Sequence, residues 1–123
     1  MNLDETFSSY GIGVMATAGA DGQVNTAVYA RPHLINNETL VWGMTEGRTF
    51  RNLAENPHAA YLFREDSPGF RGVRLQLELL RTEEGGEMLD NIRQETNRIV
   101  GPAAGSRVTH AVWFRITEKR ALI

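Results

Sequence analysis

Residues 39–63, TLVWGMTEGRTFRNLAENPHAAYLF, predict a strand, a tight turn, a short helix and a second strand in succession. Residues 39–44 are rich in β-branched and aromatic side chains, which strands favour, and Gly47 closes the polar turn that follows. Residues 48–56 carry apolar side chains at the spacing of one helix face. Pro57 then ends the helix, because the residue before a proline is disfavoured in the helical conformation.

The start of this helix has the composition of an anion-binding site. The first backbone N–H groups of a helix lack partners and lie at the positive end of the helix dipole, where phosphate groups bind. Arg48 adds a permanent charge with a planar fork of donors, Thr49 adds a hydroxyl, and Gly47 allows the backbone to come close. The alternative is that Arg48 is a solvated surface charge and Gly47 only a turn residue, and the stretch alone leaves both open.

The chain before this stretch predicts a β-hairpin. Residues 12–18 and 24–30 have strand composition, and the Asp-Gly dipeptide between them is a strong signal for a two-residue turn. Side chains alternate along a strand, so Asn25 and Thr26 are expected to point to opposite faces. Both can serve one phosphate only if one of them uses its backbone or if the strand bulges.

The rest of the chain adds two strands and two helices. Residues 72–81 alternate apolar and polar side chains. Residues 108–117 form a last strand with Trp113 on its polar face, which favours contact with a partner surface or a ring system. Residues 84–100 switch to the helical period, with an apolar stripe expected in the core, and residues 4–9 predict a short helix packed across the barrel mouth.

Together these segments predict a mainly β protein with six strands and three helices. The strands are joined by short links, so neighbouring strands are expected to be antiparallel, and this pattern favours a closed Greek-key barrel. The 123 residues suffice for a single domain, residues 1–123, with one modest core. No repeat, linker or low-complexity segment divides them.

Composition and charge exclude several classes of function. The net charge is −2, the isoelectric point is about 5.9 and there is no basic run, so neither nucleic acid nor an anionic membrane is an expected partner. No apolar run is long enough to span a bilayer. The N-terminal residues, MNLDETFSSYG, lack the basic start and apolar middle of a signal peptide, so a cytoplasmic location is expected.

The sequence contains no cysteine, which excludes disulfides, thiolate nucleophiles and thiolate metal ligands. The three histidines, His33, His58 and His110, show no metal-binding spacing, so no metal site is expected. No nucleotide-binding glycine motif or nucleophile motif is present. Any redox chemistry therefore has to come from a borrowed cofactor.

The opening stretch resembles the FMN-binding split-barrel family, the pyridoxamine 5′-phosphate oxidase-like proteins. In that family a strand, a turn with a basic residue and Ser or Thr, and a helix ending in Asn-Pro hold the flavin phosphate. The matching segments here are Gly43-Met44-Thr45, Arg48-Thr49, Asn52-Leu53 and Asn56-Pro57, preceded by a hairpin in which Val24-Asn25-Thr26 resembles the second-strand segment of the small FMN-binding members. The ordered set covers the first two-thirds of the chain.

The resemblance implies a six-stranded antiparallel Greek-key split barrel that binds FMN near the interface of a homodimer. It assigns two sets of residues to the cofactor, with Asn25, Thr26, Arg48 and Thr49 at the phosphate and the backbone of Gly43, Met44 and Thr45 along the edge of the isoalloxazine ring. FMN would supply the hydride or single-electron chemistry, and the protein would hold and tune it. The sequence indicates no catalytic acid or base, no substrate and no electron donor.

The chain also departs from the pyridoxamine phosphate oxidases themselves. Those enzymes carry a longer C-terminal segment with substrate motifs and a second basic residue at the position of Thr49, whereas this sequence ends EKRALI. The resemblance therefore favours an FMN-dependent oxidoreductase of unknown substrate, similar to the small FMN-binding proteins or flavin reductases. Two alternatives are a non-catalytic carrier or electron-transfer module for FMN, a deazaflavin or haem, and a purely structural domain. Tyr29, Arg31 and Trp113 are candidates for a pocket beside the flavin, with core or interface roles as the alternative.

Overall fold

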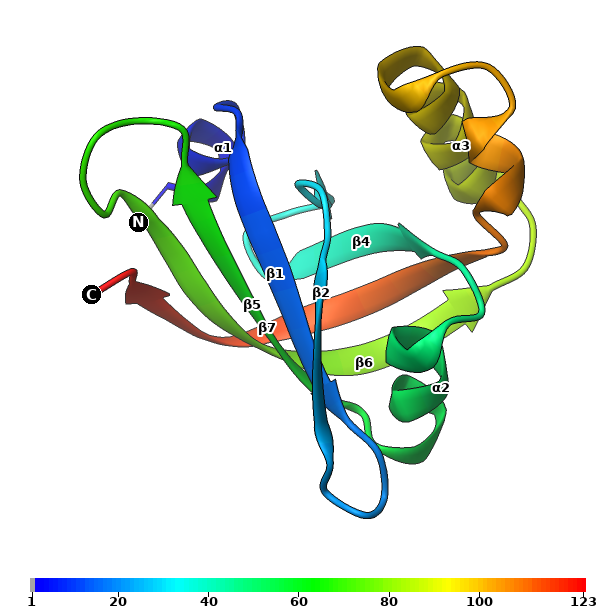
Figure 1. The fold of residues 1–123 in the computed structure, drawn as a ribbon, viewed down its shortest axis with the longest axis horizontal. Helices are drawn as coiled ribbons and strands as arrows, with labels where there is room; N and C mark the ends of the chain where they lie inside the picture. The colour runs from blue at the N-terminus through cyan, green and yellow to red at the C-terminus, as the bar shows by residue number, and fades with distance from the viewer. Residues whose placement is uncertain (1) are drawn as a thin grey trace.

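The computed structural model describes residues 2–123, which form seven strands, three α-helices and one short 3-10 helix (Figure 1). In chain order these are α1 (Leu3–Thr6), β1 (Gly11–Ala18), β2 (Val24–Val28), β3 (His33–Leu34), β4 (Thr39–Met44), α2 (Arg48–Glu55), β5 (His58–Glu65), β6 (Gly72–Glu83), α3 (Glu87–Val100), the 3-10 helix (Ala104–Arg107) and β7 (His110–Ala121). The strand, helix and strand predicted within residues 39–63 are present as β4, α2 and β5. None of the helices in residues 2–123 is both long and apolar enough to cross a membrane.

The strands form one antiparallel sheet in the order β2-β1-β5-β6-β7-β4-β3. The mainly β fold with three helices is as predicted, but the sheet has seven strands rather than six. Its end strands, β2 and β3, do not pair with each other among the described residues, so the prediction of a closed barrel is wrong. The additional strand β3 has only two residues and follows Pro32, and it is therefore too short to show a periodicity in the sequence.

The two long strands β6 and β7 bend the sheet over on itself. Each has 12 residues, and their pairing shifts register between Gln76 and Leu77 and again between Leu79 and Arg81. Irregularities of this kind bend a strand and increase its twist. As a result β1, β2 and β5 cross over the layer that contains β4 and β7 (Figure 1).

The core is aromatic, and Tyr61 is at its centre. Its ring lies 4.7 Å from that of Trp42, and its hydroxyl donates to the backbone carbonyls of Tyr29 and Ala30 at 3.1 Å each. A Cβ atom at Gly13 would collide with this hydroxyl, so β1 needs glycine where it passes Tyr61. These contacts join β1, β5, β4 and the end of β2.

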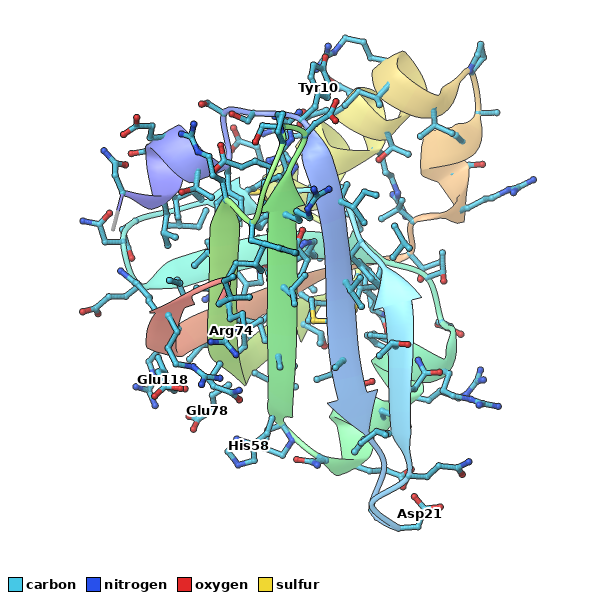
Figure 2. All side chains as sticks on the ribbon, turned by 60° about the vertical axis from the view of Figure 1, so that its left-hand side comes forward. Tyr10, Asp21, His58, Arg74, Glu78 and Glu118 are labelled. Carbon is cyan, nitrogen blue, oxygen red and sulfur yellow. The ribbon has the colours of Figure 1, made fainter. Side chains whose placement is uncertain are left out.

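The opposite face of β1, β2 and β5 is apolar and exposed. Residues directly opposite each other in an antiparallel pair share a face, and the register sets Val14 opposite both Val28 and Leu62. Val24 and Val28 are each 77% exposed, and Ile12 is 62% exposed. These three strands lie side by side at the front of Figure 2. We term this surface the outer apolar face, and it consists of Ile12, Val14, Ala16, Val24, Val28 and Leu62.

Candidate functional site

The β1–β2 hairpin and the helix α2 enclose a hollow of about 520 Å³. Two of the predicted phosphate residues, Asn25 of β2 and Arg48 of α2, both line it. The structure therefore brings together two residues that the sequence linked only through the family resemblance. The other lining residues come from the hairpin turn and from one side of α2, and they are Gly19, Ala20, Asp21, Gln23, Val24, Arg51, Asn52 and Glu55.

The start of α2 suits an anion. Gly47, the residue before the helix, has an extended backbone (φ −86°, ψ −166°), and no side chain caps the helix there. Arg48 is exposed, and its guanidinium forms no hydrogen bond or ion pair with another residue in the described part of the chain. Arg51 lies on the same hollow, where its Nη1 donates to the carbonyl of Glu46 at 2.9 Å. Free helix N–H groups and an uncommitted guanidinium are the donors that a phosphate group requires.

Side-chain hydrogen bonds hold α2 against the hairpin. Asn52 Nδ2 donates to the hydroxyl of Thr17 at 3.1 Å, and Thr17 is opposite Asn25 in the pairing of β1 with β2. The carboxylate of Glu55 accepts the N–H of Ala20 at 3.4 Å. Both bonds form away from the first turn of the helix, so the positive end of the hollow remains at Arg48.

Thr49 and Thr26, the other two predicted phosphate residues, are not among the residues that line this hollow. Thr49 is only 4% exposed and shares a hydrogen bond with the phenol of Tyr29. Burial raises the pKa of Tyr29, and the hydrogen bond with Thr49 opposes that shift. Thr26 is exposed and lies on the side of β2 opposite to Asn25, as expected from alternation along a strand. Their roles at a phosphate stay predictions.

The three residues predicted along the ring edge lie at and just after the end of β4. Gly43 faces α3, and a Cβ there would lie 2.6 Å from Ile92 Cγ2, so glycine allows the helix to pack against the strand. Met44 has a buried side chain, and its carbonyl accepts the N–H of Thr109 at 3.0 Å and the Thr109 hydroxyl at 3.2 Å. Thr45 is exposed in the turn. The backbone of Met44 is thus already bonded within the chain.

A second cavity, of about 470 Å³, lies between α3 and the sheet. Tyr29 and Gly43 both line it, and Tyr29 is the residue whose phenol interacts with Thr49 in the first turn of α2. Its rim includes a contact between His33 Nε2 and Glu95 Oε2 at 3.4 Å. The remaining walls are mostly apolar, with Phe7, Ala30, Arg31, Pro32, Trp42, Ile92, Thr96, Ile99, Val100 and Val108.

Of the three residues predicted beside a flavin, Tyr29 and Arg31 line the second cavity and Trp113 does not. Arg31 also holds the end of α1 and the loop after it, because its Nη1 donates to two backbone carbonyls there at 3.1 and 3.0 Å. Trp113 donates its indole N–H to Glu83 at 2.6 Å, and the guanidinium of Arg81 lies 3.9 Å from its ring centroid. Trp113 therefore has its partners within its own chain.

No protein-family model and no curated protein matches the sequence. Solved structures match it over nearly the whole chain. An FMN-binding protein from Syntrophomonas wolfei subsp. wolfei superposes with a TM-score of 0.80 at 19% identity, covering 98% of this chain and 86% of that one. The chain has the split-barrel fold. A pyridoxamine 5′-phosphate oxidase-like protein from Listeria innocua (TM-score 0.76, 17% identity, 98% and 94% of the two chains) and HutZ, the heme storage protein from Vibrio cholerae (0.63, 18%, 97% and 91%), share it.

Two residues that line the hollow between the β1–β2 hairpin and α2, Arg51 and Asn52, were not expected as ligands from the sequence. The signal was present, because residues three and four positions after Arg48 lie on the same side of a helix. What the sequence could not show is that this side of α2 faces the tip of the first hairpin. That arrangement depends on contacts between segments far apart in the chain.

Some of the residues at the hollow and the second cavity, but not all of those expected, fit a planar cofactor that carries a phosphate group. The hollow supplies an uncommitted arginine and an uncapped helix start, and the second cavity has the volume and the aromatic and apolar lining of a small-molecule pocket. Two of the expected donors and acceptors, the Thr49 hydroxyl and the Met44 carbonyl, are satisfied internally. Of the residues expected at the phosphate, Arg48 and Asn25 are the two that line the hollow.

Proposed function

We propose that this protein binds FMN, with the phosphate in the hollow at the start of α2, and that it is a flavin-dependent oxidoreductase of unknown substrate. The observation that carries the proposal is the uncommitted Arg48 at the uncapped start of α2. A flavin phosphate carries close to two negative charges near neutral pH, and a guanidinium stays charged throughout that range. FMN would supply hydride or single-electron transfer, and the chain would bind and orient it.

The second cavity supports a place for the isoalloxazine ring. Gly43 and Tyr29 line it, and Tyr29 contacts Thr49 next to Arg48. A ring bound there would be shielded from water by α3 and by Trp42. The phosphate and the ring would then lie on the two sides of the Tyr29–Thr49 hydrogen bond.

A second candidate function is that of a non-catalytic carrier of FMN, of a deazaflavin or of haem. The likeness to HutZ favours this alternative. A carrier and an enzyme differ in turnover. Consumption of NADH or NADPH by the loaded protein would identify a reductase, whereas tight binding without turnover would identify a carrier.

We further propose that the protein is a homodimer with FMN near the subunit interface. The outer apolar face supports a second copy as the partner, because a large exposed apolar patch marks an interaction surface. Thr26 lies on that side of β2 and Asn25 on the other, so the strand is placed between the hollow and the proposed interface. A cytoplasmic location remains an expectation from the N-terminal sequence.

The test of the proposed site is the variant Arg48→Ala. Hydrogen bonds to charged groups contribute about 1.5–3 kcal/mol each, so the dissociation constant of FMN should rise roughly 10- to 1,000-fold. The matched control is Arg71→Ala, which removes an exposed arginine from the loop between β5 and β6, at the other end of β5 from α2. The measurement is flavin fluorescence during titration of FMN into ligand-free protein.

Three further ligands separate the alternatives. Riboflavin lacks the phosphate, so it should bind wild type weakly and lose little more in Arg48→Ala. Haemin and a deazaflavin, titrated in the same way, test the carrier alternatives. An Arg48→Ala protein that binds FMN as tightly as wild type would disprove the phosphate site. A wild type that binds haemin but not FMN, or that binds neither FMN nor haemin, would disprove the flavin function.

A further inference from the structure

His110, the first residue of β7, is buried against the turn that joins β4 to α2. It is 4% exposed, and its ring stacks on Phe50 of α2 with centroids 4.1 Å apart and planes at 27°. Its Nδ1 lies 2.8 Å from the hydroxyl of Thr109, and its Nε2 lies 3.3 Å from Glu84 Oε1 and 4.0 Å from Glu46 Oε1. One imidazole thus contacts α2, the β4–α2 turn and the segment that leads into α3.

The hydrogen bonds around this ring assign its protons. The hydroxyl of Thr109 donates to the carbonyl of Met44 at 3.2 Å, so its oxygen is left to accept from Nδ1–H of His110. The carboxylate of Glu84 can only accept, so Nε2 must also carry a proton. All three contacts are satisfied together only by the doubly protonated ring. A neutral ring has to lose either the contact with Glu84 or the bond from the Thr109 hydroxyl to Met44, whose carbonyl then keeps only the N–H of Thr109 at 3.0 Å.

We propose that His110 is a positioning residue whose second proton holds the β4–α2 turn in the shape that binds the cofactor phosphate. The proposal rests on the function proposed above and adds its regulation by pH. Met44 ends β4, Glu46 lies in the turn and Phe50 lies in α2, so the ring holds the chain on both sides of Arg48. His110 does not line the hollow and acts through these neighbours.

The charge of the ring acts in the same direction as its hydrogen bonds. Among residues 2–123, the carboxylates within 4.0 Å of the ring nitrogens are those of Glu84 and Glu46, both exposed. When the ring releases its proton to solvent, the two carboxylates remain and a positive charge beside α2 is lost. An anion at the start of α2 is then held less tightly. Imidazoles change charge between about pH 5 and 8, which is the range to examine.

The test is the pH dependence of FMN binding in wild type and His110→Gln, followed by flavin fluorescence. The matched control is His58→Gln, which changes an exposed histidine at the start of β5 (Figure 2). The FMN phosphate also titrates in this range, but its contribution cancels when the dissociation constant of each variant is divided by that of wild type. For His110→Gln this ratio should fall roughly three- to tenfold as the pH rises, because wild type loses the charge that the variant never had. For His58→Gln it should stay constant.

The outcomes distinguish this inference from the proposed function. A ratio for His110→Gln that does not change with pH overturns the inference, whereas a wild type that fails to bind FMN overturns the function. In the second case the ligand-free protein still reports on the turn. The amide resonances of Met44 and Thr45 should shift with pH in wild type and stay fixed in His110→Gln, and equal shifts in both proteins would disprove the coupling. If His110→Gln does not fold, His110→Phe keeps the stack on Phe50 and replaces it in both measurements.

Discussion

At the scale of single residues, the start of α2 shows how two neighbours acquire opposite roles. Arg48 points to solvent and lines the hollow, whereas Thr49 is buried and bonds to Tyr29. Successive residues of a helix point in different directions, so one phosphate is not expected to receive both side chains. The sequence predicted that Gly47 and Arg48 stand at the start of this helix, as they do. It could not predict the partner of Thr49, because Tyr29 belongs to a strand that only the tertiary fold brings near.

The buried tyrosines predict how the stability of the protein depends on pH. Burial raises the pKa of Tyr61 above its usual range, although Arg31 opposes the shift, and burial raises the pKa of Tyr29 as well. Tyrosine in an unfolded chain ionises near pH 10. The stability that these groups contribute is therefore complete below about pH 10 and declines at higher pH, where the unfolded chain releases protons that the folded chain retains.

The variant Tyr61→Phe tests this dependence. Near neutral pH it should lower the free energy of unfolding by about 1 kcal/mol, because the bonds to the carbonyls of Tyr29 and Ala30 are lost. The deficit should narrow above about pH 10, where wild type loses stability through this hydroxyl and the variant does not. Urea unfolding from neutral pH to above about pH 10 measures the difference in free energy of unfolding between variant and wild type. The control is Tyr10→Phe, which changes an exposed tyrosine (Figure 2). A deficit that stays constant into the alkaline range would contradict the role of Tyr61.

At the scale of elements, the regular segments were predictable and their irregular neighbours were not. The alternation in residues 72–81 and the helical period in residues 84–100 each identify an element, and β6 and α3 are present there. α3 begins at Glu87 rather than Glu84, after two glycines whose cost in a helix delays its start. β3 has no period to detect. The packing of α3 on β4 was also not predictable, because it depends on a glycine within a strand.

Gly43 is the residue on which the packing of α3 against β4 depends. A methyl group there would lie 2.6 Å from Ile92 Cγ2 and 2.7 Å from Val108 Cγ1, so Gly43→Ala forces the helix or its side chains to move. The free energy of unfolding should fall by about 1–3 kcal/mol, as for other overpacked sites. The control is Gly85→Ala, where nothing lies within 4 Å of the added carbon and the change should stay within about 0.5 kcal/mol. Equal urea midpoints for the two variants would show that α3 is not held closely at Gly43.

At the scale of the whole molecule, the surface most suited to a partner is not the one that the sequence indicated. Trp113 lies opposite Val41 and packs against the apolar cluster beneath α3 rather than on a polar face, and Glu83 and Arg81 already bind it. The outer apolar face lies on the first hairpin and β5, and the sheet becomes charged beyond it, at Arg74 and Glu78 of β6 (Figure 2). Alternation in the first hairpin indicated which residues share a face. It could not indicate which face the core covers, because that depends on how β6 and β7 bend the sheet.

Val28 tests whether a second copy covers the outer apolar face. Burying a valine side chain contributes about 1.5–3 kcal/mol, and a two-fold interface contains each residue twice. Val28→Lys should therefore weaken the dimer by roughly a hundredfold or more, which at micromolar concentration converts it to monomer. The comparison variant is Val100→Lys on α3, where a valine of similar exposure is replaced outside this face, at the wall of the second cavity. Light scattering after size-exclusion chromatography measures the mass of each protein. A monomeric wild type would contradict the homodimer, and a Val28→Lys protein that remains dimeric while Val100→Lys dissociates would place the interface on α3 instead.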